Sequence, residues 1–147
     1  MSRPELPPSD PLRERLERAA SGLVYSSEGD HPFEFFAVDA SGSADSSAEA
    51  LAPLLLPEYR PGDRIEERTL DQFLGRHIER VDPFDRESLG LRPRYEALRK
   101  ELRSALAAPR VVRVTRASDR AVVRCFIVGR ERDGRRLAGL ATSAIET

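Results

Sequence analysis

Three strand-like segments in the last third of the chain constrain the fold more than any other feature. They span residues 111–117, 121–130 and 136–145, and each is rich in apolar, strand-favouring residues. Ser118-Asp119 separates the first two segments and Asp133-Gly134 separates the last two. Both pairs are residue types that favour tight turns between antiparallel strands. We therefore predict a C-terminal meander of three antiparallel strands.

Apolar residues recur at intervals of three and four in two other segments, residues 11–23 and 95–106. This spacing is typical of a helix that buries one face. Asp10 is a suitable N-cap for the first predicted helix, and Pro109 is expected to stop the second.

Weaker patterns occupy the middle of the chain. Aromatic and branched residues at 33–39 and 65–68 predict two strands, and residues 48–56 and 69–78 predict two short helices. Residues 80–93 contain two prolines, a glycine and alternating charges. We expect this last segment to be an exposed loop, which is where binding residues are often found.

Together these elements predict an α+β fold, with helices covering an antiparallel sheet as an α-β-α sandwich. The length of 147 residues suits one domain, which we expect over residues 11–147. The first ten residues contain three prolines and little to bury, so they predict a flexible arm. No apolar run approaches a membrane span or a secretory signal, so we expect a cytoplasmic protein that does not bind membranes.

Charge is distributed unevenly along the chain, although the formal net charge is only −1. Residues 23–90 carry fifteen acidic and six basic side chains, whereas residues 91–147 carry six acidic and fourteen basic ones. The acidic segment predicts either a basic partner or neutralisation by the basic segment within the fold, and the sequence leaves both open. The arginines are scattered without a run of stacking aromatics, which argues against direct nucleic-acid binding.

The sequence offers little support for catalysis. Cys125 lies in an alternating strand pattern and is expected to be buried, although sequence distance alone leaves a Cys–His pair open. His31 and His77 belong to no metal-binding motif, and we expect both to be surface or capping residues. No glycine-rich phosphate loop is present. We therefore predict a protein that is not an enzyme and has no cofactor of its own.

Several carboxylates occur close together in turns and loops. Such groups can act as general acids or metal ligands, can be solvated surface, or can imitate phosphates in a cationic groove of another protein. The sequence leaves these alternatives open. The pairs are Glu28 with Asp30, Glu66 with Glu67, and Asp82 with Asp85.

One stretch of sequence is distinctive enough for a comparison with a known family. Residues 22–36, GLVYSSEGDHPFEFF, follow an amphipathic helix and resemble the signature of the nuclease A inhibitor family. That signature is a Gly-apolar-apolar-aromatic-x-Ser-Glu turn followed by Pro-Phe-Glu. Residues 102–114 and 126–147 resemble the family's last helix and its final two strands, which end in Glu-Thr. Residues 70–76 are more weakly similar, and the motifs agree in order across most of residues 12–147.

The resemblance implies a small inhibitor that forms a one-to-one complex with a sugar-nonspecific ββα-metal endonuclease, an enzyme that degrades DNA and RNA. It also implies that Glu28, Asp82 and Thr147 make the key contacts, with Thr147 reaching the catalytic magnesium of the bound nuclease. A nuclease cleft must be cationic and hold a divalent metal, so carboxylates and hard oxygen donors are suitable substitutes for phosphate. Magnesium would thus be bridged only in the complex.

Three neighbours of these residues are expected to take part in the same interface. They are Asp30, Phe84 and Glu146. The family's described inhibitor has an aromatic residue directly after the loop aspartate, whereas here Pro83 separates Asp82 from Phe84. Because an aromatic anchor can carry much of an interface's affinity, this departure leaves a second hypothesis open. In that hypothesis the chain is an interaction or regulatory module of the same fold with a different protein partner.

Overall fold

A single antiparallel sheet of five strands organises the protein, whose computed structural model describes residues 10–39, 47–132 and 134–146. The strand order is β3-β7-β6-β5-β4, and every neighbouring pair is antiparallel. The predicted C-terminal meander is confirmed as β5-β6-β7. The strands are β3 (Glu34–Val38), β4 (Arg64–Thr69), β5 (Leu106–Thr115), β6 (Val122–Glu131) and β7 (Leu137–Ile145).

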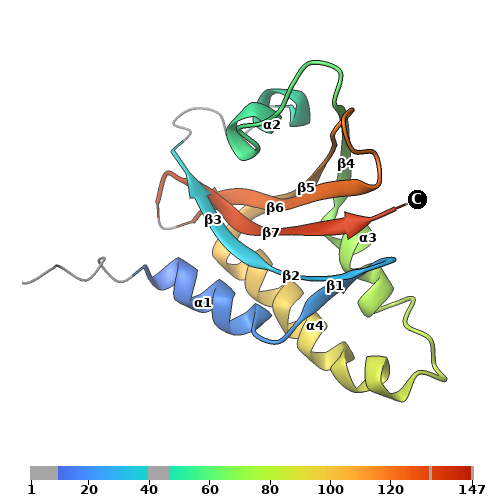
Figure 1. Ribbon diagram of the computed structural model, residues 1–147. Coiled ribbons are helices and arrows are strands. Elements are labelled where there is room, and N and C mark those ends of the chain that lie inside the picture. Colours follow the sequence, from blue (N-terminus) through green and yellow to red (C-terminus); the bar gives the residue numbers. More distant parts are fainter. Residues whose placement is uncertain (1–9, 40–46, 133, 147) are drawn as a thin grey trace, which may run out of the picture.

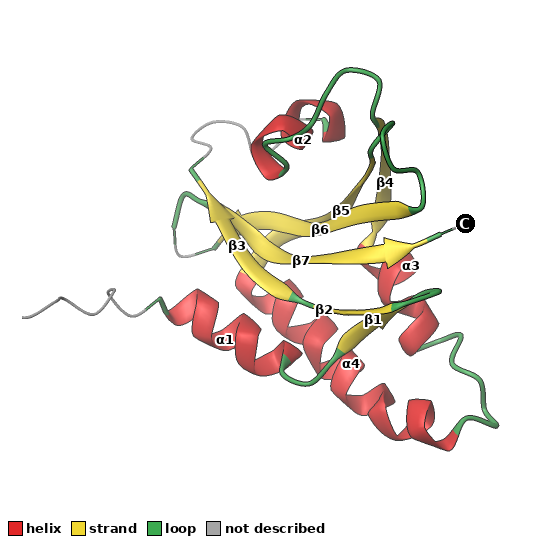
Figure 2. Cartoon of the chain, in the orientation of Figure 1, coloured by secondary structure: helices red, strands yellow, loops and turns green. Residues whose placement is uncertain are grey.

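Helices cover both faces of this sheet, as Figures 1 and 2 show. On one face lie α1 (Pro11–Ala20), α3 (Leu70–Leu74) with the 3₁₀ turn η1 (Gly75–His77), and α4 (Arg86–Ala105). The other face is covered by α2 (Ala48–Leu55). The predicted α+β sandwich is therefore confirmed, with two hydrophobic cores separated by the sheet.

Alternation along the central strands explains the two cores. In β5, Val111 is buried on the side of α1 and α4, whereas Val112 and Val114 are buried on the side of α2. In β6, Ile127 and Val128 divide in the same way. Successive side chains of a strand point to opposite faces, so a strand that is buried on both faces becomes apolar throughout.

A second, two-stranded sheet lies beside the main one. It is a hairpin of β1 (Val24–Ser26) and β2 (Asp30–Pro32), in which Val24 pairs with Pro32 and Ser26 with Asp30. The sequence predicted neither of these strands. They flank the turn at Ser27-Glu28 and are too short and too polar to show a periodic pattern.

Two predicted boundaries of the longest helix are wrong. Helix α4 begins at Arg86, so the second half of the predicted loop 80–93 is helical, and Pro93 lies inside the helix. At the other end the helix stops at Ala105 and the chain enters β5 directly at Leu106, before Pro109. A bulge between residues 107 and 110, in which Ala108 has a φ of 47°, takes Pro109 into the strand.

The start of α1 is well defined. Asp10 accepts a hydrogen bond from the backbone N–H of Arg13 at 3.3 Å and forms a two-pronged ion pair with Arg136. Residues 1–9 of the expected arm lie outside the described residues. No helix in the described ranges combines the length and the apolar character that crossing a membrane requires.

Candidate functional site

An acidic cleft of about 520 Å³ lies between the β1–β2 hairpin and the first turns of α4. Four carboxylates line it. Asp30 comes from β2, Asp82 from the loop that precedes α4, and Asp85 and Glu87 from the start of α4. In Figure 1 this region lies on the same side of the molecule as the label that marks the C-terminus. We call these four residues and the space between them the acidic cleft.

Local hydrogen bonds give the loop side of the cleft its shape. The Asp82 carboxylate accepts a hydrogen bond from the N–H of Phe84 at 2.9 Å, and the Asp82 carbonyl accepts one from Asp85 at 3.0 Å. Asp85 then caps α4 by accepting from the N–H and the hydroxyl of Ser88, at 3.1 and 2.7 Å. These bonds lower the pKa of Asp85, so its carboxylate stays ionised at the rim of the cleft.

Phe84 projects from this loop into solvent. Its side chain is 91% exposed, whereas the other exposed large apolar residue among the described ones, Leu54, is 41% exposed. Removing such a ring from water by binding to a partner is favourable, and nothing in the fold uses it. The loop thus presents one aromatic ring beside a group of carboxylates.

The tip of the β1–β2 hairpin is attached to the end of β7. The Ser27 hydroxyl accepts a hydrogen bond from the N–H of Ile145 at 2.9 Å, and the N–H of Glu28 donates to the carbonyl of Ile145 at 3.2 Å. Glu146, the next residue, donates its N–H to the carbonyl of Ala121 at 2.8 Å. Glu28 and Glu146 therefore lie at neighbouring places, although 117 residues separate them in sequence.

The acidic segment divides into two groups of carboxylates. One group pairs with arginines of the basic segment: Glu67 with Arg110, Asp63 with Arg116, and Asp71 and Glu79 with Arg99. Within the described residues, by contrast, no basic side chain forms an ion pair with any carboxylate of the acidic cleft. Arg76 also lines the cleft, but its guanidinium donates to the carbonyl of Ser26. Ion pairs within the described fold thus account for part of the acidic segment but not for the carboxylates of the cleft.

Residues 10–147 match the family model of the nuclease A inhibitor-like proteins. The chain belongs to this family. No curated protein matches the sequence.

The residues that the sequence predicted for this inhibitor-like protein fall into two neighbouring groups. Asp30 and Asp82 both line the acidic cleft, and Phe84 lies in the loop that carries Asp82. Glu28 and Glu146 form the second group at the hairpin tip, where the Glu146 carboxylate pairs with Arg113 at 2.5 Å. Thr147 lies outside the described residues.

Sequence reasoning missed two carboxylates of the acidic cleft as members of a common site. Asp85 was noted only as the partner of Asp82 in a charged loop, and Glu87 was not singled out. The signal was available, because aspartate is a favoured N-cap and acidic residues such as Glu87 are enriched in the first turn of a helix. Recognising that start would have placed both residues on the first turn of α4.

The expectation for His77 is wrong. Its ring is half-buried, stacks on Tyr95 with a centroid separation of 4.1 Å and meets Tyr25 edge-on at 5.7 Å. Burial is the main cause that lowers its pKa to about 4, so the ring is neutral at pH 7. His31 is also half-buried instead of lying on the surface, and its Nδ1 is buried with no hydrogen-bond partner among the described residues.

Neither a reactive thiol nor a metal-binding group provides a site among the described residues. Cys125 is fully buried, as predicted, and burial raises its pKa to about 11, which disfavours the reactive thiolate. The described residues contain no group of His, Cys, Asp and Glu side chains that could hold a metal ion.

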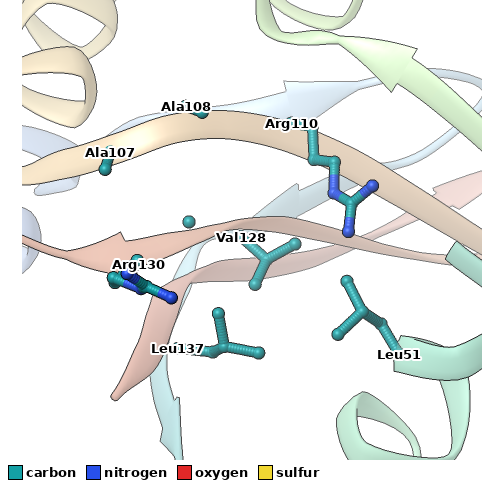
Figure 3. A pocket seen from close by; sticks show the side chains of 8 residues that line it. Leu51, Ala107, Ala108, Arg110, Val128, Arg130 and Leu137 are labelled. Atoms are coloured by element: carbon teal, nitrogen blue, oxygen red, sulfur yellow. The ribbon is translucent and has the colours of Figure 1, made fainter. Parts of the chain in front are cut away.

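Figure 3 shows a cavity of about 110 Å³ between α2 and the sheet, near Leu51, Val128 and Arg110. It is well below the roughly 300 Å³ at which ligand pockets begin.

Proposed function

We propose that this protein is a non-catalytic inhibitor that occupies the active-site cleft of a sugar-nonspecific ββα-metal endonuclease in a one-to-one complex. The observation that carries the proposal is the acidic cleft, whose four carboxylates have no basic partner within the described fold and lie beside the exposed ring of Phe84. Membership of the nuclease A inhibitor-like family supports the same function. We expect the protein to act in the cytoplasm.

The chemistry of a nuclease explains why carboxylates would serve. An enzyme that binds the phosphates of DNA and RNA must present cationic side chains and a divalent metal in its cleft. Ionised carboxylates offer oxygen acceptors of the same charge sign as phosphate and can form charge-assisted hydrogen bonds with arginine and lysine. In the proposed complex, Asp30 and Asp82 face such cations from the cleft, and Glu28 does so from the hairpin tip.

Phe84 supplies the apolar part of the proposed interface. Aromatic side chains that enter a pocket of the partner commonly dominate the binding energy, while surrounding polar contacts set orientation and specificity. The hydrogen bond from the Phe84 N–H holds the backbone of Phe84 next to the Asp82 carboxylate. The two residues are therefore proposed to bind as a unit.

The end of the chain is proposed to approach the nuclease's magnesium. Glu146, the last described residue, is held by its backbone bond to Ala121 and its ion pair with Arg113. Thr147 follows, and a hydroxyl oxygen is a ligand type that magnesium accepts. Removing Thr147 is predicted to weaken inhibition and leave the melting temperature nearly unchanged. The same inhibition by full-length and shortened proteins, measured at several magnesium concentrations, would reject this contact.

The function is tested by capturing partners from the source organism and measuring metal-dependent nuclease activity as the protein is added. The proposal predicts capture of a ββα-metal endonuclease and loss of activity that is complete at one equivalent of inhibitor. Capture of no nuclease, together with full activity of the candidate endonucleases, would refute it.

A second candidate is an interaction module of the same fold whose partner is not a nuclease. The position of Phe84, two residues after Asp82 instead of directly after it, favours this alternative because the anchor then meets a differently shaped pocket. A specific partner that lacks a nuclease domain and binds through Phe84 would support it over the leading proposal.

A further inference from the structure

Within the described residues, the outer edge of strand β1 has no neighbouring strand, yet its backbone groups are paired. The N–H of Ser27 donates to the carbonyl of Gly29 at 3.0 Å across the hairpin. Along an antiparallel ladder, residue pairs that exchange hydrogen bonds alternate with pairs that do not. Because Ser27 and Gly29 are hydrogen-bonded, Tyr25 and His31, two residues further along each strand, form the next bonded pair. Val24 and Ser26 consequently direct their N–H and C=O groups away from β2.

Three side chains from other elements take up these four groups. The Tyr95 hydroxyl donates to the carbonyl of Val24 at 2.6 Å and accepts from its N–H at 3.3 Å. The N–H of Ser26 donates to Nε2 of His77 at 3.3 Å, and the guanidinium of Arg76 donates to the carbonyl of Ser26. Tyr95 comes from α4, whereas Arg76 and His77 come from η1.

Ring contacts fix these side chains beneath the hairpin. His77 stacks on Tyr95 with the ring planes 8° apart, and Tyr25 stacks on Phe73 at 4.2 Å with the planes 1° apart. The Arg76 guanidinium lies over the Tyr25 ring, 5.1 Å from its centroid. Backbone groups that are removed from water must find partners, and here the partners are themselves packed and cannot easily move away.

We infer that Arg76, His77 and Tyr95 are positioning residues that substitute for a neighbouring strand on the edge of β1, and that they hold the hairpin so that Glu28 and Asp30 face the partner. This inference rests on the proposed function for the partner, but its structural half concerns the free protein alone. All three residues also line the acidic cleft, but their hydrogen bonds to β1 give them a role in the free protein whether or not they touch the nuclease.

The neutral form of His77 is required, because only an unprotonated Nε2 accepts the hydrogen bond from Ser26. Tyr25 and Tyr95 contact the ring, Arg76 precedes it in the chain, and the carboxylates of the acidic cleft line the same space. Burial and Arg76 favour the neutral ring, whereas Asp30 favours the charged one. Since the pKa is lowered from 6.5 to about 4, the stabilisation is complete above pH 6.5 and is lost as the pH falls towards 4.

Two substitutions distinguish the role of His77 as a hydrogen-bond acceptor from its role as a stacking ring. His77→Phe keeps a flat ring for stacking and removes the acceptor, whereas His77→Gln keeps a neutral acceptor that does not titrate. Amide hydrogen exchange in the free protein is expected to rise about tenfold at Ser26 and Glu28 in His77→Phe, while the amides of β6 stay protected. In the wild type the same two amides are expected to lose protection between pH 6.5 and 4, and in His77→Gln they are expected to be less sensitive to pH.

His31→Gln is the matched control because the protein has only two histidines. Unchanged exchange at Ser26 and Glu28 in His77→Phe, or a pH response that disappears in His31→Gln instead, would overturn the positioning role. For an endonuclease that the wild type inhibits, His77→Phe should weaken inhibition and His77→Gln should largely restore it. Equal inhibition by all three proteins would overturn the link to binding. If the wild type inhibits no endonuclease, the proposed function fails, and the exchange measurement still decides the positioning role.

Discussion

The β5-β6-β7 meander and the β1–β2 hairpin are both antiparallel, but they are stabilised in different ways. In the meander, each strand bonds to the next over nearly its whole length and packs into cores on both faces. In the hairpin, each strand has three residues, and side chains of Arg76, His77 and Tyr95 satisfy the outer edge. The meander is therefore determined by backbone pairing and burial, and the hairpin by a few specific contacts.

This difference separates stability from binding. Changes in the meander should affect the whole domain, because cooperative folding depends on its ladder and its buried faces. Changes in the hairpin or in the adjoining loop should alter the presented carboxylates while the domain stays folded. The predictions below test this separation, beginning with the largest expected effect.

Gly139→Ala should have the largest effect because it disrupts the meander. A Cβ at this position would overlap the carbonyl oxygen of Ile127 on the neighbouring strand, and backbone atoms cannot move aside cheaply. We expect a loss of more than about 4 kcal/mol in the free energy of unfolding, measured by urea denaturation. Gly90→Ala is the matched control, since a Cβ there meets nothing and alanine favours helix. A Gly139→Ala protein as stable as Gly90→Ala would contradict this view of the meander.

Glu28→Gln should have the next largest effect, on binding alone. It keeps the shape of the side chain and removes its charge, so a carboxylate that pairs with a cation of the nuclease should lose about 2–5 kcal/mol of binding free energy. Glu49→Gln on the opposite helix α2 is the control, because Glu49 is equally exposed to solvent but far from the site by fold topology. Inhibition constants that change equally in the two variants would assign Glu28 to ordinary solvated surface.

Phe84→Ala should weaken inhibition by about 2 kcal/mol, as expected for an aromatic anchor, and should not lower the melting temperature. The ring contributes little to the fold because it is 91% exposed. Leu54→Ala, which removes the other exposed large apolar side chain among the described residues, provides the comparison. Phe84 is not an anchor if both variants inhibit like the wild type.

Tyr95→Phe should have the smallest effect of the four, on the hairpin edge. The change keeps the ring stacked on His77 but leaves the N–H and carbonyl of Val24 without their partner. We expect the free energy that protects β1 from local opening to fall by about 1 kcal/mol, seen as faster amide exchange in β1 before any change in β6. Amide exchange that becomes faster by the same factor in β1 and β6 would show that the hairpin and the meander form one cooperative unit.

The meander and the main helices can be predicted from the sequence because the pattern of apolar residues in each segment reflects which of its side chains are buried. Apolar runs in β5 to β7 and the three-and-four spacing of Tyr95, Leu98 and Leu102 record which side chains are buried. The start of α4 was missed because Pro93 and Gly90 suggested a loop, whereas the hydrogen bonds of Asp85 with Ser88 begin a helix that tolerates both.

The candidate site is only partly predictable. Asp82 came from the family resemblance, Asp30 and Phe84 were predicted as neighbours of the residues that it named, and the structure gathers all three at one end of the molecule. The role of His77 could not be inferred, because its hydrogen bond to Ser26 joins segments 51 residues apart. A polar residue near a helix end gives no local signal that it will complete the edge of a distant strand.

The central claim is that the acidic end of the molecule, and not the face covered by α2, binds the nuclease. Hydrogen exchange of the one-to-one complex with the cognate endonuclease tests it directly. The account predicts new protection at residues 26–30 and 81–88, with the amides of α2 (Ala48–Leu55) exchanging as they do in the free protein. Protection of α2 with unchanged exchange at the hairpin and the loop would contradict it.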